Sequence, residues 1–197
     1  MFRQSRETKV HVTLAQCARR RERIATGVPF FDHLLQQMAA HSGLTMLASA
    51  VGDCFLDKHH VVEDVGIAVG ATLTRLQCNL SRTNRYGCFY APLDETLAHA
   101  VVDFSGRPTL SAGAGSAGCV CSFNAHLVVE FFRAVSRTVG VSMHVDVVRG
   151  LERHHRAEAV FKAFGRAMRH AIRVDARSAA STKGFLASDN EDGRRHC

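Results

Sequence analysis

Two copies of one histidine motif are the residues of this sequence best suited to chemistry. The first, HHVVE, occupies residues 59–63, and the second, HHRAE, occupies residues 154–158. Each copy precedes a stretch with apolar residues at helical spacing, and composition alone predicts far less than one such motif in 197 residues. The pair therefore indicates an internal repeat that carries function.

The spacing within each motif predicts how its side chains are directed. In an α-helix, residues four apart share one face, whereas adjacent residues point about 100° apart. We therefore expect His59 to pair with Glu63, and His154 with Glu158, while the second histidine of each motif points elsewhere. Imidazole and carboxylate together suit a divalent ion such as Mn, Fe, Co or Zn. Two such helices could form two equivalent metal sites, each with a His–Glu pair from one motif and the second histidine of the other.

Strands and helices alternate around both motifs in a similar way, as judged from hydrophobic periodicity. The expected strands are residues 8–17, 44–53, 99–110 and 141–148, and the expected helices are residues 26–43 (with a leading loop), 59–80, 124–140 and 154–174. Residues 84–87 are expected to form a turn and residues 111–118 a loop. This pattern predicts an α+β fold of two similar sheet-plus-helix halves packed together, residues 1–92 and 93–186, followed by a polar tail at residues 187–197.

The composition is that of a folded protein with an anionic partner. Hydrophobic residues make up 46% of the chain, and the formal net charge is +7 with histidine neutral. That charge suits a phosphorylated small molecule, a nucleic acid or a membrane surface, without choosing among them. No apolar run reaches the length of a membrane span, and MFRQSRETKV lacks the apolar core of a signal peptide. The seven cysteines include no CxxC pair, so we expect a reduced, cytoplasmic protein without a disulfide framework or cysteine zinc site.

A pattern larger than the two motifs runs through nearly the whole chain. It consists of the segments RETKV, TGVPFFDHLLQQMAAHSG, DKHHVVEDVGIAVG, RYGCFYAPLDETLA, VDFSGRP, GLERHHRAEAVFKA and STKG, in that order. In sequence and spacing these segments resemble the imidazoleglycerol-phosphate dehydratase family. The resemblance implies removal of water from imidazole glycerol phosphate, giving imidazole acetol phosphate in histidine biosynthesis. It also implies a duplicated α+β fold like that of ribosomal protein S5 domain 2, two Mn²⁺ ions per active site, and a homo-oligomer of 24 subunits with active sites between subunits.

The resemblance assigns the family's functional positions residue by residue. The implied metal ligands are His33, His59, His60, Glu63, His144, His154, His155 and Glu158. The implied substrate contacts are Glu7, Gln37, Arg85, Asp94, Arg107, Lys162, Ser181 and Lys183. Three residues depart from the family's usual pattern: Glu152 stands in place of Asn, and Lys58 and Val61 flank the first histidine pair where Asp or Thr is more usual. None of them removes a ligand, but neighbours of metal ligands tune affinity and rate.

The implied reaction requires loss of a hydrogen from the carbon next to the imidazole ring. We hypothesise that a metal on each ring nitrogen stabilises an imidazolate, and that hydroxide then leaves through a diazafulvene-like intermediate. Glu7 and Glu158 are the candidate acid and base, although Glu158 can also act purely as a ligand. The phosphate group requires fixed cations, for which Arg85, Arg107 and Lys183 are suited.

Three alternatives remain open at this point. Lys162 lies one helical turn after Glu158, so it can form an ordinary salt bridge as well as contact substrate. The same ligands could serve a dinuclear metal hydrolase of phosphoester or amide bonds, in which a metal-bound water is the nucleophile. A non-enzymatic binder of metal or nucleic acid also fits the charge, but 7% aromatic residues and the lack of a recognised nucleic-acid motif argue against nucleic acid.

Overall fold

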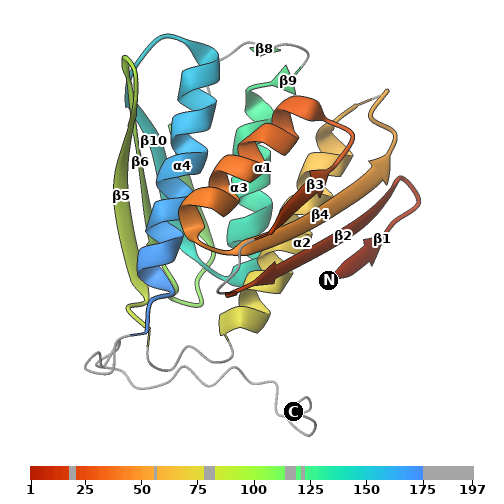
Figure 1. The fold of residues 1–197 in the computed structure, drawn as a ribbon, viewed down its shortest axis with the longest axis horizontal. Helices are drawn as coiled ribbons and strands as arrows, with labels where there is room; N and C mark the ends of the chain where they lie inside the picture. Colours follow the sequence, from red (N-terminus) through yellow and green to blue (C-terminus); the bar gives the residue numbers. More distant parts are fainter. Residues whose placement is uncertain (18–20, 56, 78–82, 114–118, 121–122, 175–197) are drawn as a thin grey trace, which may run out of the picture.

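The fold consists of two halves, each built from a four-stranded sheet and two long helices (Figure 1). A computed structural model of the chain describes residues 1–17, 21–55, 57–77, 83–113, 119–120 and 123–174. The first half contains β1 (Phe2–Gln4), β2 (Thr8–Ala15), β3 (Glu22–Ala25), α1 (Pro29–Ser42), β4 (Thr45–Gly52) and α2 (His59–Gln77). The second half contains β5 (Tyr86–Leu93), β6 (Thr96–Asp103), β7 (Thr109–Ala112), β8 (Cys119–Val120), β9 (Phe123–Asn124), α3 (His126–Val139), β10 (Ser142–Arg149) and α4 (Arg153–Ala171).

The two sheets share one topology. The strand order is β1-β2-β4-β3 in the first sheet and β5-β6-β10-β7 in the second. The central pairs β2–β4 and β6–β10 are antiparallel, and the edge strands β3 and β7 run parallel to β4 and β10. In both halves one helix precedes the last strand and a longer helix, which carries the histidine motif, follows it. The predicted α+β fold with an internal duplication is therefore confirmed.

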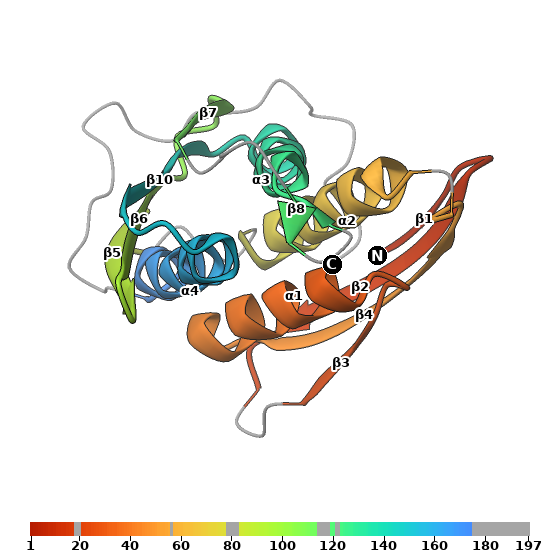
Figure 2. The same ribbon diagram turned by 90° about the horizontal axis from the view of Figure 1, so that it is seen from above.

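The four helices lie between the two sheets, so that each sheet has one buried face (Figure 2). The helix α1 packs against α4, and α2 packs against α3. Where these helices meet, Phe31, Phe131, Phe132, Phe161 and Phe164 are buried, and neighbouring rings such as those of Phe132 and Phe164 have centroids 5.0 Å apart. Each buried aromatic side chain stabilises the fold by about 1.5–3 kcal/mol through removal of apolar surface from water. The two halves therefore share one core.

Helix ends follow the local sequence. The helix α1 begins with Pro29, whose fixed φ suits the first turn, and ends at Gly43, which is left-handed with φ 76°. The predicted stop of α3 at Gly140 is confirmed, since this residue is its C-cap with φ 74°. At the start of α3, the Asn124 side chain accepts a hydrogen bond of 2.9 Å from the backbone N–H of His126. In the described part of the chain, no helix combines the length and apolar composition needed to cross a membrane.

The strand β5 differs from the sequence prediction, which gave a turn at residues 84–87. Its inward face carries Gly87, Phe89, Ala91 and Leu93, whereas Tyr86 and Tyr90 point outward and are both 55% exposed. Because aromatic residues lie on both faces, the strand shows no clear alternation of apolar and polar residues. Because β5 belongs to the second sheet, that sheet begins before the boundary of residues 92 and 93 that we expected.

The two short edge strands β3 and β7 also differ from the sequence prediction. The strand β3 is mostly exposed and shows no apolar alternation. The single strand expected over residues 99–110 is divided into β6 and β7 by a loop, so only the first two residues of β7 were expected as strand. Residues 111 and 112 of the expected loop lie in β7. Other predictions lie outside the described residues: the end of the second helix at 78–80, the rest of the loop at 114–118, and the chain beyond residue 174.

Close approach of β5 to α4 explains the need for glycine at position 87. A Cβ atom added at Gly87 would lie 1.9 Å from the carbonyl oxygen of Ala167, which is backbone and cannot move independently of α4. We expect Gly87→Ala to lower the free energy of unfolding by about 1–3 kcal/mol, because the strand and helix must separate. Denaturant unfolding at equal protomer concentration measures this. The matched control is Cys88→Ala on the exposed face of the same strand, and equal stability of both variants would contradict the packing argument.

Candidate active site

Packing of α1 against α4 brings three candidate metal ligands together. His33 Nε2 and His154 Nε2 each lie 3.0 Å from Oε2 of Glu158. One ligand atom from each of the three residues lies within 4.8 Å of the others. Among the described residues, this is the one group of three or more His, Cys, Asp or Glu side chains that converges so closely. Two imidazoles and a carboxylate fit a divalent metal of the kind expected.

The carboxylate of Glu158 stays ionised in this cluster. Burial opposes its ionisation, but hydrogen bonds with Lys162, His33 and His154 outweigh burial and lower its pKa to about 2. Nζ of Lys162 lies 2.7 Å from Oε1 of Glu158, so the ordinary salt bridge that the spacing allows is present. The other oxygen, Oε2, faces the two histidines. Glu158 is therefore a fixed anion at neutral pH, as a metal ligand must be.

The first motif places its side chains as the helical spacing predicts. His59 Nε2 lies 3.4 Å from Glu63 Oε2 across one turn of α2. The ring of His60 is nearly perpendicular to that of His59, at 87°, with centroids 6.1 Å apart. Its Nδ1 lies 3.2 and 3.3 Å from the two oxygens of Asp53 and 3.5 Å from the carboxylate of Glu7. Hydrogen bonding with Asp53 is the main cause that raises the pKa of His60.

The second motif repeats this arrangement. The rings of His154 and His155 cross at 88° with centroids 6.1 Å apart. His155 Nδ1 lies 2.8 Å from Oε2 of Glu95, whereas Asp94 approaches its Nε2 only to 3.6 Å. The hydrogen bond with His155 is the main cause that lowers the pKa of Glu95 to about 2, and the same bond raises the pKa of His155. In both motifs, the second histidine is thus held by a carboxylate at Nδ1.

Two of these carboxylates were absent from the expected site residues. Glu95 adjoins the predicted position Asp94 in the turn between β5 and β6, and Asp53 directly follows β4. Each is an acidic residue close in space to a histidine motif, but Asp53 is separated from its histidine by a short loop and Glu95 by 60 residues. The sequence signal for Asp53 is its position shortly before the first motif. The signal for Glu95 is its place in the acidic pair of PLDE. Neither signal reveals which histidine nitrogen is contacted.

The remaining expected ligand, His144, lies apart from the cluster of His33, His154 and Glu158. It is exposed on β10, on the face of the second sheet that points away from the helices. In the part of the chain that the structure describes, His144 belongs to no converging group of three donors, and neither do His59, His60 and Glu63. One chain therefore gathers three of the eight expected ligands.

The expected substrate contacts are spread over several elements. Arg85 has φ 63°, and its guanidinium donates to both oxygens of Asp103 at 2.7 and 3.2 Å, which raises its pKa. Gln37 is half-buried on α1, one turn after His33. The backbone N–H of Arg107 donates to Ser105 Oγ at 3.2 Å in the loop after β6. Ser181 and Lys183 lie outside the described residues.

The three departures from the family pattern have structural roles of their own. Glu152 is the N-cap of α4, and its side chain accepts a hydrogen bond of 2.7 Å from the backbone N–H of His155. Its negative charge also interacts favourably with the N-terminal end of the helix. Val61 is fully buried and points into the core. The backbone oxygen of Lys58 accepts from Val62 at the start of α2.

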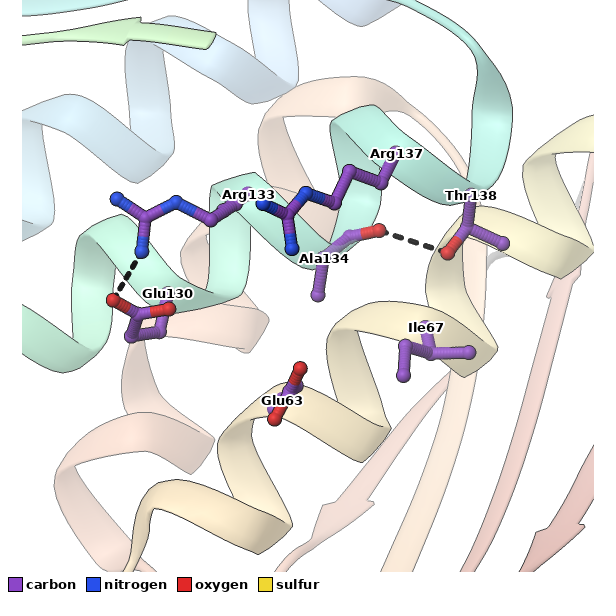
Figure 3. A pocket seen from close by; sticks show the side chains of 7 residues that line it. All are labelled: Glu63, Ile67, Glu130, Arg133, Ala134, Arg137 and Thr138. Carbon is purple, nitrogen blue, oxygen red and sulfur yellow. Dashed lines mark hydrogen bonds and ion pairs between the residues drawn. The ribbon is translucent and has the colours of Figure 1, made fainter. Parts of the chain in front are cut away.

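An open pocket of about 180 Å³ lies between α2 and α3, beside the first motif (Figure 3). Its lining includes Glu63 and Ile67 from α2 and a charged stripe of α3 in which Glu130 forms an ion pair with Arg133. Arg137 follows one turn later. The pocket therefore places cationic side chains near one expected metal ligand, on the opposite helix pair from the cluster around Glu158.

Comparison with known proteins places the chain in a family. The sequence model described as imidazoleglycerol-phosphate dehydratase matches residues 26–168, a range that includes both histidine motifs. The chain is 44% identical over 188 residues to the imidazoleglycerol-phosphate dehydratase of Cupriavidus metallidurans, a match that covers 93% of this chain and 96% of that protein. It is 43% identical over 190 residues to the protein of the same name from Burkholderia vietnamiensis, covering 94% and 97% of the two chains.

Solved structures show the same similarity in three dimensions. The crystal structure of imidazoleglycerol-phosphate dehydratase from Staphylococcus aureus has a TM-score of 0.76 and 38% identity, covering 88% of this chain and 98% of that chain. The enzyme from Pyrococcus furiosus, solved in complex with (S)-C348, has a TM-score of 0.82 and 30% identity, covering 94% and 100%. With the same fold, a matching family model over residues 26–168 and this degree of identity, the chain belongs to the imidazoleglycerol-phosphate dehydratase family.

Proposed function

We propose that this chain removes water from imidazole glycerol phosphate, giving imidazole acetol phosphate in histidine biosynthesis, at a dinuclear metal site. The observation that carries the proposal is the convergence of His33, His154 and Glu158, three positions that the family resemblance gives as metal ligands. A reaction on an imidazole ring benefits from a metal on each side of the ring, which also accounts for a duplicated motif. The dehydration itself follows from membership of the family.

The donor set supports manganese as the metal, with two ions in each active site. His33, His154 and Glu158 would hold one ion, and the pair His59 and Glu63 would contribute to the other. When bound, the metals would supply positive charge at the ring nitrogens and so stabilise negative charge that develops on the ring. Imidazole and carboxylate ligands suit Mn²⁺, although they also suit neighbouring divalent metals.

Each site requires residues from more than one chain in this proposal. His60 and His155 leave Nε2 as their remaining nitrogen for a metal, because carboxylates occupy Nδ1. Neither histidine joins the cluster around Glu158 among the described residues. A second copy of the chain would bring these histidines and His144 to complete the coordination, in the 24-subunit homo-oligomer that the family resemblance implies.

Glu7 is the better candidate for proton transfer in this chain. Its side chain is 55% exposed in the turn between β1 and β2 and lies 3.5 Å from His60, so it borders the metal centre without being committed to it. Glu158, in contrast, contacts two histidines and Lys162 and has a pKa of about 2. Both oxygens of Glu158 are already engaged, Oε1 by Lys162 and Oε2 by His33 and His154. Glu158 therefore acts as a ligand, and Glu7 moves the proton.

Cationic side chains would bind the phosphate group. Arg107 lies in the exposed loop after β6, and Arg85 presents a guanidinium that is oriented by Asp103. Planar guanidinium groups bind phosphate oxygens in pairs, which fixes orientation as well as charge. The family resemblance implies five further substrate contacts, which we include in the proposal: Gln37, Asp94, Lys162, Ser181 and Lys183.

We propose a reducing, cytoplasmic compartment for this enzyme. Cys17, Cys54 and Cys88 are free thiols in the described part of the chain. Free thiols suit a reducing compartment, and amino-acid biosynthesis of this kind fits a cytoplasmic enzyme.

Removal of the metal tests the proposed function. Protein stripped of metal by a chelator is expected to release no imidazole acetol phosphate, and addition of Mn²⁺ should restore the reaction. The reason is that negative charge on the imidazole ring of the substrate would no longer be stabilised without metal. Product formation is followed directly by mass spectrometry, with Mg²⁺ as the control ion that prefers oxygen ligands. Equal activity with and without Mn²⁺ would contradict the metal centre. Release of inorganic phosphate without dehydration would favour a hydrolase instead.

A further inference from the structure

We propose that Glu95 is a positioning residue that fixes the ring of His155 for metal binding, and that it is the counterpart of Glu7 in the duplicated fold. This inference rests on the proposed metal centre and adds to it a residue that the family resemblance does not assign. It concerns the carboxylates in the two equivalent hairpin turns. Their different roles explain why one turn supplies a reactive group and the other does not.

The topology establishes which residues correspond. The strands β1 and β2 in the first sheet match β5 and β6 in the second, because both pairs are antiparallel and occupy the same places in the strand order. The strands β2 and β6 begin at Thr8 and Thr96, which are both buried, at 2% and 1% exposure. Glu7 and Glu95 directly precede these threonines. The two glutamates therefore occupy equivalent turns.

Both oxygens of Glu95 are engaged. Oε2 lies 2.8 Å from Nδ1 of His155, while Oε1 accepts hydrogen bonds from the backbone N–H of Glu152 at 3.1 Å and from Thr96 Oγ1 at 3.0 Å. The carboxylate is thus fixed by the chain before α4 and by its own strand. A carboxylate at Nδ1 places the ring proton there, which leaves Nε2 free as a ligand atom and sets the direction of the ring.

In the first half, a different residue orients the second histidine of the motif. Asp53 approaches Nδ1 of His60 with both oxygens, at 3.2 and 3.3 Å, from the segment after β4 rather than from the hairpin turn. Glu7 is consequently the more distant partner of the same nitrogen, at 3.5 Å, and stays 55% exposed. Because Asp53 orients the histidine, Glu7 is available for substrate. In the second half, Glu95 itself approaches Nδ1 of His155, at 2.8 Å, and is committed to it.

Manganese binding to the assembled, metal-stripped protein tests this role without measuring catalysis. Titration followed by electron paramagnetic resonance should show that Glu95→Ala weakens Mn²⁺ binding at one of the two sites by about 10- to 100-fold, the usual effect of losing a partner of a ligating histidine. Glu95→Gln keeps a carbonyl oxygen that accepts from Nδ1 and should recover most of the affinity. Glu22→Gln, on the exposed edge strand β3, is the matched control for loss of a surface carboxylate and should bind like the unaltered chain.

The outcomes separate this inference from the proposed function. Affinities for Glu95→Ala within twofold of the unaltered chain at both sites would overturn the positioning role alone. Equal weakening in Glu95→Ala and Glu95→Gln, with a matching loss of thermal stability before metal is added, would also overturn it, because it would indicate a purely structural contact. If the unaltered chain bound no Mn²⁺, the metal centre of the proposed function would be wrong and this inference with it.

Discussion

Glu158→Gln is expected to lower kcat/KM for dehydration by about 10²- to 10⁴-fold, the range found when a charged group at a reacting centre is lost. The substitution keeps the size of the side chain but removes the negative charge that two histidines and Lys162 share. An amide also has only one oxygen, so it cannot accept from Lys162 and offer a second oxygen to a metal as the carboxylate does. Steady-state kinetics at saturating Mn²⁺ measure the effect.

The control for Glu158→Gln must separate loss of a ligand from loss of the fold. Glu158 is only 9% exposed, so the variant should be compared with the unaltered protein for assembly size and thermal unfolding. Glu22→Gln provides a control for loss of a carboxylate outside both histidine motifs, since Glu22 is exposed on the edge strand β3. Activity of Glu158→Gln within threefold of the unaltered protein would mean that the cluster between α1 and α4 does not hold the metal.

Co-assembly of His59→Ala chains with His155→Ala chains should restore activity that neither variant has alone. If one site takes His59 from one chain and His155 from another, random mixing of equal amounts leaves about one quarter of the sites with both histidines, as the combinatorics of a closed homo-oligomer require. The structure favours this outcome because the two histidines belong to no common cluster within the described part of one chain. Activity per protomer after joint refolding measures the recovery.

A second pair of variants shows whether recovery has the proposed cause. His59 and Glu63 lie one turn apart on α2, and the distance from His59 Nε2 to Glu63 Oε2 is 3.4 Å. In the proposal they therefore serve the same site from the same chain. Joint refolding of His59→Ala with Glu63→Ala chains should therefore give no active sites. Recovery in this control, or none in the pair with His155→Ala despite correct assembly, would show that the ligands are not shared between chains in the proposed way.

Local features of this protein were determined by the sequence alone. The pairing of His59 with Glu63 and of His154 with Glu158, and the divergence of the second histidine from each pair, depend only on residues within one helical turn. The helical period fixes such relations wherever the helix lies. The duplication was equally visible, because both copies of the motif repeat the same local order of strand, turn and helix.

Contacts between distant segments were decided only by the tertiary structure. His33 meets Glu158 across 125 residues of sequence, and Glu95 meets His155 across 60, because α1 packs on α4 and the hairpin turn of the second sheet reaches the start of α4. The strand β5 was missed because aromatic residues lie on both of its faces and because close approach to α4 requires glycine at position 87. Packing selects residues for shape at such places and not for hydrophobic pattern, so periodicity cannot find them.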